Sequence, residues 1–265
     1  MNIEHEETYK GCKIKLMQDT DARSPREDCN VGTMVCWHRL YNLGDEQPNE
    51  DMETWVRGNI EPATWEAEKE RREYEIRSRS PRPDLAGSDE EREDSRRELN
   101  DALDAVESDM ENDAELCRRL FKRDNIVLPL FLYDHSGISM STGDFGDRWD
   151  SGQVGFIYCP MSTARKEWTG TDEEIQARAI ARMEGEVRVY SSYLEGDVVG
   201  FVAEDPDGGE IDSCWGFFPD EREGYGKRWD YPLGEARAAV DRWVEQQSKE
   251  QSERAYWEAR DTITK

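Results

Sequence analysis

The sequence lacks the patterns that identify several large classes of protein. No apolar run approaches the roughly 20 residues that a transmembrane helix needs, and the opening MNIEHEETYK has no apolar stretch of a signal peptide. The six cysteines contain no CxxC pair, which argues against a zinc ribbon. The sequence also has no HExxH, EF-hand loop, P-loop or GxSxG motif. We therefore expect a cytoplasmic protein with reduced thiols and no enzymatic signature.

Lysine is scarce, and acids far outnumber bases. The chain has 61 Asp and Glu against 35 Lys and Arg, a formal net charge of -26. Three interpretations stay open: general solubility or adaptation to salt, solvated helical faces, and mimicry of a polyanion that occupies a nucleic-acid-binding groove on a partner. Direct binding of DNA or RNA is disfavoured, because the phosphates would approach a repelling surface.

The chain is rich in aromatic residues. Hydrophobic residues make up only 35% of the sequence, but 9 Trp, 10 Tyr and 7 Phe can bury enough area for a compact fold. Alternating apolar runs and turn residues predict strands at 7–18, 31–37, 125–134 and 153–160, and a hairpin of 198–204 with 210–218. The expected class is α+β, with a small, mostly antiparallel sheet, packed helices and a charged helical hairpin.

The charged helical hairpin is predicted in residues 62–122. A helix begins near Pro62, a Pro/Gly/Ser stretch at 79–88 breaks it, and Ser88 with Glu91 has the spacing of a capping box that opens a second helix towards Arg123. The apolar stripe of this second helix is narrow, so we favour an arm that binds a partner or a second copy over a helix packed in the core. The predicted partner-binding residues are Leu99, Leu103, Val106, Met110, Trp65 and Tyr74.

This hairpin divides the chain into three parts. Residues 1–61 form a β-rich part, 62–122 the arm or insertion, and 123–265 an α+β core that we expect to make one domain with 1–61. If the arm hypothesis holds, a chain without 62–122 should keep a folded core and lose binding.

A polar, glycine-rich loop at 134–150 is the one candidate ligand site. Its Asp, His and Ser side chains suggest a divalent metal or a nucleotide, although nothing fixes their spacing. The alternative is that these residues cap turns while Trp149 and Phe145 anchor the loop by burial. The candidate residues are Asp134, His135, Ser136, Asp144, Asp147 and Asp150 in the loop, with Asp19, Asp21, His38 and Asp212 from elsewhere.

Two neighbouring segments resemble a family of uncharacterised phage and prophage proteins. LPLFLYDHSGISMST is similar to the family's LPL-x-LYDHSG-x-x-x-ST stretch, and RWDSGQVGFIYCP to its WDSGQVG-x-IY stretch. The segments GTMVCWHRLYNLGD, EGDVVGFVAED and EIDSCWGFF fit the same pattern, and residues 50–122 do not. The resemblance implies an accessory role in a virus or mobile element, in the cytoplasm of the host cell, and it implies no reaction.

The leading hypothesis combines this resemblance with the acidity. We expect a non-enzymatic acidic binding protein that occupies a host protein or complex of anti-phage defence or nucleic-acid processing, and that can form a homo-oligomer. The alternatives are a metal- or nucleotide-binding enzyme or ligand-sequestering protein that uses the 134–150 loop, and a virion assembly protein. No membrane partner and no organic cofactor are expected, and a divalent metal is the one cofactor left open.

Overall fold

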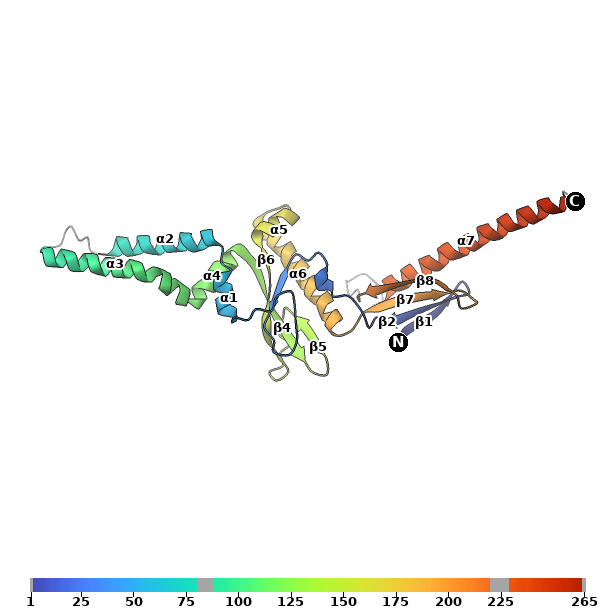
Figure 1. The fold of residues 1–265 in the computed structure, drawn as a ribbon, viewed down its shortest axis with the longest axis horizontal. Helices are drawn as coiled ribbons and strands as arrows, with labels where there is room; N and C mark the ends of the chain where they lie inside the picture. Colours follow the sequence, from blue (N-terminus) through green and yellow to red (C-terminus); the bar gives the residue numbers. More distant parts are fainter. Residues whose placement is uncertain (1, 81–87, 220–228, 264–265) are drawn as a thin grey trace. The chain divides into compact units, whose positions relative to one another are not determined.

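The computed structural model describes residues 2–80, 88–219 and 229–263. In these residues the chain forms seven α-helices and two four-stranded antiparallel sheets, which confirms the predicted α+β class (Figure 1). It divides into two compact units. Unit 1 comprises Met1–Cys29, Leu132–Ser141 and Glu186–Lys265, and unit 2 comprises Asn30–Phe131 and Thr142–Gly185. These boundaries differ from those expected at 61 and 122, and the single domain made of 1–61 and 123–265 stays a prediction.

The helices and strands alternate irregularly along the chain. The strands are β1 (Ile3–Tyr9), β2 (Cys12–Gln18), β3 (Thr33–Cys36), β4 (Asn125–Asp134), β5 (Ile138–Ser141), β6 (Ser151–Pro160), β7 (Val199–Glu204) and β8 (Glu210–Phe217). The helices are α1 (Met52–Gly58), α2 (Pro62–Arg79), α3 (Asp89–Asn112), α4 (Ala114–Asp124), α5 (Met161–Glu167), α6 (Asp172–Leu194) and α7 (Asp230–Ile263), with a 3₁₀ turn at Pro25–Glu27. One sheet has the order β1-β2-β7-β8 and the other β3-β6-β4-β5.

The first sheet begins with a hairpin where the sequence predicts one strand over 7–18. Lys10 and Gly11 adopt positive φ angles of 49° and 84°, which suits the tight turn of a two-residue hairpin. The single strand is therefore wrong, and β1 pairs with β2 from Tyr9↔Cys12 onwards. The predicted hairpin of β7 and β8 is confirmed, and its turn is held by the Asp205 carboxylate, which accepts hydrogen bonds from the N–H groups of Asp207 and Gly209.

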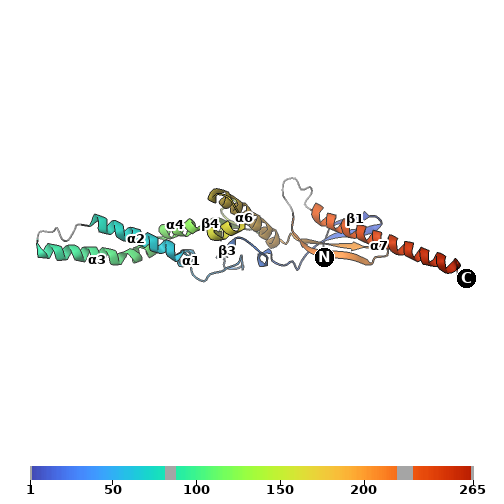
Figure 2. The same ribbon diagram turned by 90° about the horizontal axis from the view of Figure 1, so that it is seen from above.

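One face of this sheet is covered by the first half of α7. Alternation along β2 places Ile14 and Leu16 on the same face as Phe201 of β7, and these side chains are buried against Ala236 and Val240 of α7. Both ribbon views show α7 lying along the sheet and then continuing beyond the strands (Figures 1 and 2). This cluster is the core of unit 1.

The core of unit 2 is built from aromatic rings. Trp55 of α1 and Phe121 of α4 meet Phe156 and Tyr158 of β6, with ring centroids 5.5–6.2 Å apart and mostly edge-to-face. A lean hydrophobic composition is thus offset by few, large side chains.

The long helix expected between Ser88 and Arg123 is interrupted. Its capping box is confirmed, because the Ser88 hydroxyl accepts from the Glu91 N–H and the Glu91 carboxylate accepts from the Ser88 N–H. Asp113 then ends α3 and caps α4, where its carboxylate accepts from the Leu116 N–H at 2.9 Å. The break turns α4 so that its apolar face can enter the aromatic core.

Candidate protein-binding surface

The predicted ligand residues in the 134–150 loop stabilise turns. Asp134 ends β4, and the three residues that follow form the link to β5, with Ser136 at a φ of 64°. Further along, the Asp144 carboxylate accepts from the Gly146 N–H at 2.9 Å, and the Asp147 carboxylate accepts from the N–H groups of Trp149 and Asp150 at 2.8 and 3.1 Å. These are local Asx turns, and they account for the density of Asp in this loop.

The expected anchoring of the loop by Trp149 is wrong. The Trp149 side chain is 94% exposed, and Phe145 is 39% exposed. The loop is held instead by its turn hydrogen bonds and by β5, which the sequence does not predict.

The candidates outside the loop also have local roles. His38 Nδ1 accepts from the backbone N–H of Tyr41 at 3.2 Å, and the two rings stack. The Asp19 carboxylate accepts from the Asp21 N–H, and Asp212 pairs with Arg242 of α7 at 3.4 Å. Across residues 2–80, 88–219 and 229–263, no group of three or more His, Cys, Asp and Glu is arranged to hold a metal ion. The predicted metal site is therefore not assembled there.

The cysteines offer no further site of this kind. All six are free thiols, of which Cys12, Cys36, Cys117 and Cys159 are buried and Cys29 and Cys214 exposed. Burial raises the pKa of the Cys12 and Cys117 thiols, which keeps them protonated and unreactive.

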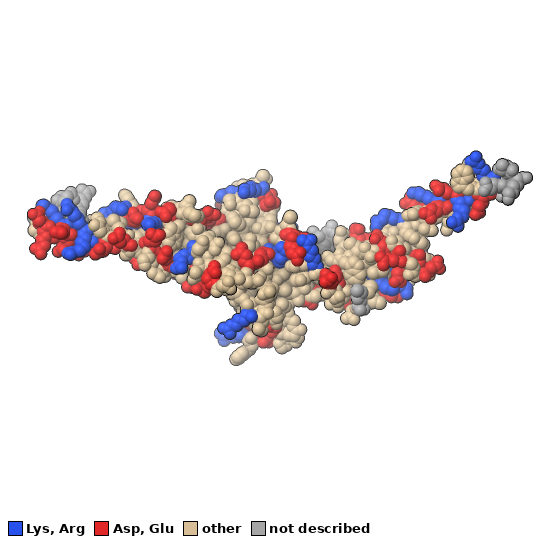
Figure 3. Space-filling view, in the orientation of Figure 1, with Lys and Arg blue, Asp and Glu red and all other residues tan. Residues whose placement is uncertain are grey.

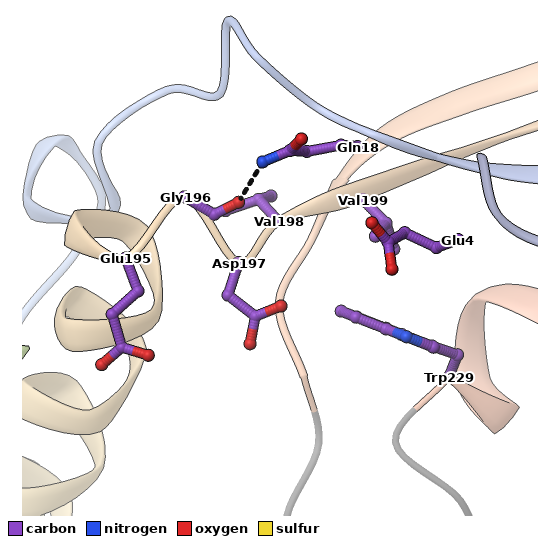
Figure 4. A pocket seen from close by; sticks show the side chains of 8 residues that line it. All are labelled: Glu4, Gln18, Glu195, Gly196, Asp197, Val198, Val199 and Trp229. Carbon is purple, nitrogen blue, oxygen red and sulfur yellow. Dashed lines mark hydrogen bonds between the residues drawn. The ribbon is translucent and has the colours of Figure 1, made fainter. Parts of the chain in front are cut away.

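A shallow pocket in unit 1 is acidic and aromatic. It measures about 300 Å³ and lies between the start of β7 and the beginning of α7. Figure 4 shows the Glu4 and Asp197 carboxylates near the Trp229 ring, with Glu195 directed away, and Gln18 donating to the Gly196 carbonyl at 3.1 Å. Carboxylates beside an indole suit a cation and repel phosphate, so this pocket does not fit a nucleotide.

The α2–α3 hairpin is the most distinctive surface of unit 2. Both ribbon views show α2 and α3 side by side (Figures 1 and 2). Lys69 of α2 pairs with Glu107 of α3 at 2.9 Å, which links the two helices of the hairpin. Its base is part of the core, since Val106 and Met110 are buried with Trp55, and Val127 of β4 packs on the same cluster.

This packing changes the set of predicted partner-binding residues. Val106 and Met110 are covered by the protein itself and are not available to a partner. Trp65, Leu99 and Leu103 are half-buried, and only Tyr74, 73% exposed, lies open. The apolar stripe therefore joins α3 to its own chain, and the opposite side of α3 is the free one.

That free side carries several acids and, over residues 98–111, no base. α3 contains 11 acids and 3 bases, a net charge of -8, whereas α2 has 5 of each and is neutral. The three bases all lie in the first half of α3, and from residue 98 to 111 there are six acids and no base. Five of the six are exposed and form no ion pair among the described residues, and we call them the acidic face: Glu98, Asp101, Asp104, Asp109 and Glu111. Figure 3 shows acidic and basic side chains intermixed along the hairpin, both dense near its far end.

Sequence reasoning missed this face because charge was averaged over a longer stretch. Arginines of α2 and of the first half of α3 conceal the run in the average, although the absence of any Lys or Arg between Arg97 and Arg118 marks it.

Comparisons with known proteins add no identification. No family model, curated protein or solved structure matches this chain. Among the described residues, no helix has the length and apolarity to cross a membrane. The resemblance to phage proteins stays a hypothesis.

Proposed function

We propose that this protein is a non-enzymatic acidic binding protein of viral type, and that the acidic face of α3 occupies the nucleic-acid-binding groove of a host factor of defence or nucleic-acid processing. The observation that carries the proposal is the row of five exposed carboxylates without an ion pair among the described residues, within a stretch over residues 98–111 that has no base. The similarity of the LPLFLYDHSG and WDSGQVG segments to phage proteins supports the viral part of the proposal.

The spacing of these charges is of the same order as that of the phosphates along a nucleic-acid strand. Thirteen helical steps of about 1.5 Å span about 20 Å, which gives the five carboxylates of the acidic face a mean spacing of roughly 5 Å along the axis. One strand of DNA carries a phosphate about every 3.4 Å. A basic groove therefore meets a row of negative charges on one side of a helix, less dense than the phosphates of a duplex but of the same sign.

The acidic face lowers the stability of α3, which argues that these acids have a function. Glu98 and Asp101, and Asp101 and Asp104, are like charges three positions apart, and each such pair destabilises a helix by about 0.2–0.5 kcal/mol. The opposite, apolar side of α3 compensates by packing on α2 and the core. A solvated helix needs no such arrangement, since alternating Glu and Arg, as in α2, keeps it equally soluble.

Affinity capture with DNA competition tests the proposal. The protein is immobilised and exposed to a bacterial lysate freed of nucleic acid, and retained proteins are then eluted with a short DNA duplex. We expect wild type to retain a nucleic-acid-binding protein that the duplex releases, and D101N/D104N/D109N to retain it at least about ten-fold less, because three attractive contacts are removed.

A matched variant controls for net charge. E61Q/E173Q/D207N neutralises three exposed acids outside α3, in both units, and should retain the same protein as wild type. Equal loss in both variants would mean that retention follows overall charge, and retention of only duplex-insensitive proteins would contradict the proposal.

A further inference from the structure

The second half of α7 is a helix that no other part of the described chain covers. Leu233, Ala236, Ala239 and Val240 in its first turns are buried against the sheet. From Ser248 to Glu258 every residue is exposed. A single solvated helix of this length is marginal in water, so a binding partner would stabilise it.

The exposed half carries a compact face of four residues. Glu253, Tyr256, Trp257 and Arg260 have the i, i+3, i+4, i+7 spacing that places side chains on one side of a helix. At 3.6 residues per turn this side lies roughly 120° around the axis from the side that covers the sheet. Tyr256 and Trp257 are 62% and 55% exposed, with their rings edge-to-face at 5.4 Å, and the Arg260 guanidinium lies 5.1 Å from the Trp257 ring.

We infer that this face, the α7 face, binds the same face of a second copy of the chain in an antiparallel, two-fold symmetric pair. When Tyr256 lies opposite Trp257 of the other copy, the same alignment places Glu253 opposite its Arg260. Each contact occurs twice, as an isologous interface requires. The centre is then a cluster of four aromatic rings flanked by two ion pairs.

The charge of the face selects a second copy as the partner. Glu253 and Arg260 cancel, so the α7 face is neutral in a chain of net charge -26, and it offers a basic partner no attraction. Two acidic copies can approach each other only through such a neutral patch, where Trp, Tyr and Arg are also the residues enriched in interfaces. Single-stranded nucleic acid, which also stacks on aromatic rings, is opposed by the same net charge.

Charge exchange between copies gives a sharp test. E253R and R260E each place like charges opposite one another in the pair, so the dissociation constant measured by sedimentation equilibrium should rise at least about ten-fold in each variant. The double variant E253R/R260E should dimerise again. An equimolar mixture of the two single variants should also form a heterodimer, because both ion pairs are then attractive.

The double variant cannot regain dimerisation through an ion pair between these two residues of one chain. Glu253 and Arg260 are seven positions apart, about 10 Å along the axis. W257A should be monomeric with an unchanged far-ultraviolet circular dichroism spectrum of its sheet-bound core, whereas W149A, which removes an even more exposed indole outside α7, should keep the wild-type mass.

Three results would overturn the inference. They are a wild-type protein that is monomeric throughout the concentration series, a dimer unaffected by the charge reversals, and loss of (dT)20 binding in W257A without a change in mass. The measurement uses the protein alone, so its outcome is independent of the host partner proposed above.

Discussion

Glu68 of α2 is a buried acid held between two arginines. The Arg71 guanidinium donates two hydrogen bonds to its carboxylate, at 2.6 and 2.9 Å, and Arg72 adds one at 3.2 Å. The hydrogen bonds from Arg71 are the main reason that the pKa of Glu68 falls from 4.5 to about 2. Burial opposes this shift, and the arginines outweigh it.

A depressed pKa makes this contact sensitive to acid. Its contribution is fully present above pH 4.5, where Glu68 is ionised in both states, and is lost as pH falls towards 2. We expect E68Q to be about 2 kcal/mol less stable than wild type at pH 6, a value reduced for the solvent-exposed side of Arg71. In urea unfolding at pH 6 and pH 3 the difference should shrink at the lower pH; a difference independent of pH would contradict the assignment.

A second ion pair lies deeper in unit 1. Arg26, in the 3₁₀ turn, approaches Glu186 of α6 at 3.4 Å, and their side chains are 6% and 4% exposed. E186A removes the Glu186 carboxylate from the buried Arg26 guanidinium and should cost about 3–5 kcal/mol of unfolding free energy. The double variant R26M/E186M removes both charges and should cost clearly less, which chemical denaturation can measure. If both variants lose the same unfolding free energy, the Arg26–Glu186 pair is not what holds the 3₁₀ turn to α6.

Among the helices and strands, features that depend on residues close in sequence can be predicted, whereas features that depend on long-range packing cannot. The capping box at Ser88 and the Asp205 turn are visible in sequence because each depends on residues a few positions apart. The break at Asp113 is not visible, since Ala114–Asp124 continues the helical pattern and only the aromatic core of unit 2 redirects it. The Asp-rich 134–150 loop suggests a metal site in the sequence for a related reason, because aspartate side chains both stabilise turns and bind metal ions.

Different parts of the hairpin contribute differently to the core, and this leads to a prediction about deletions. Replacing 62–122 by a linker removes Leu116, Leu120 and Phe121 from the core, so we now expect unit 2 to unfold rather than to remain as a folded core. Replacing only 78–98 keeps Ile76, the Lys69–Glu107 pair and the buried base, and should preserve the melting transition within a few degrees. Calorimetry of the two variants checks this, and a cooperative native-like transition in the longer deletion would show that the whole hairpin is an independent arm.

For the whole molecule, the salt dependence of the melting temperature distinguishes acidity that serves a partner from acidity that is an adaptation to high salt. A charge of -26 destabilises the compact state by self-repulsion, and screening is largely complete once the Debye length falls below about 8 Å near 0.15 M salt. If the acidity serves a partner, the melting temperature should rise modestly up to about 0.3 M KCl and then level off. A steep rise that continues beyond 1 M KCl would indicate adaptation to high salt instead.

Mutual exclusion of the protein and DNA on one partner tests the central claim most directly. A fluorescent duplex of about 20 base pairs is bound to the host factor recovered by affinity capture, and the protein is titrated in while anisotropy is followed. If the acidic face occupies the nucleic-acid groove, wild type displaces the duplex completely, D101N/D104N/D109N requires at least about ten-fold more protein, and the competition weakens as salt rises. A stable ternary complex that contains the factor, the duplex and this protein together would contradict the account.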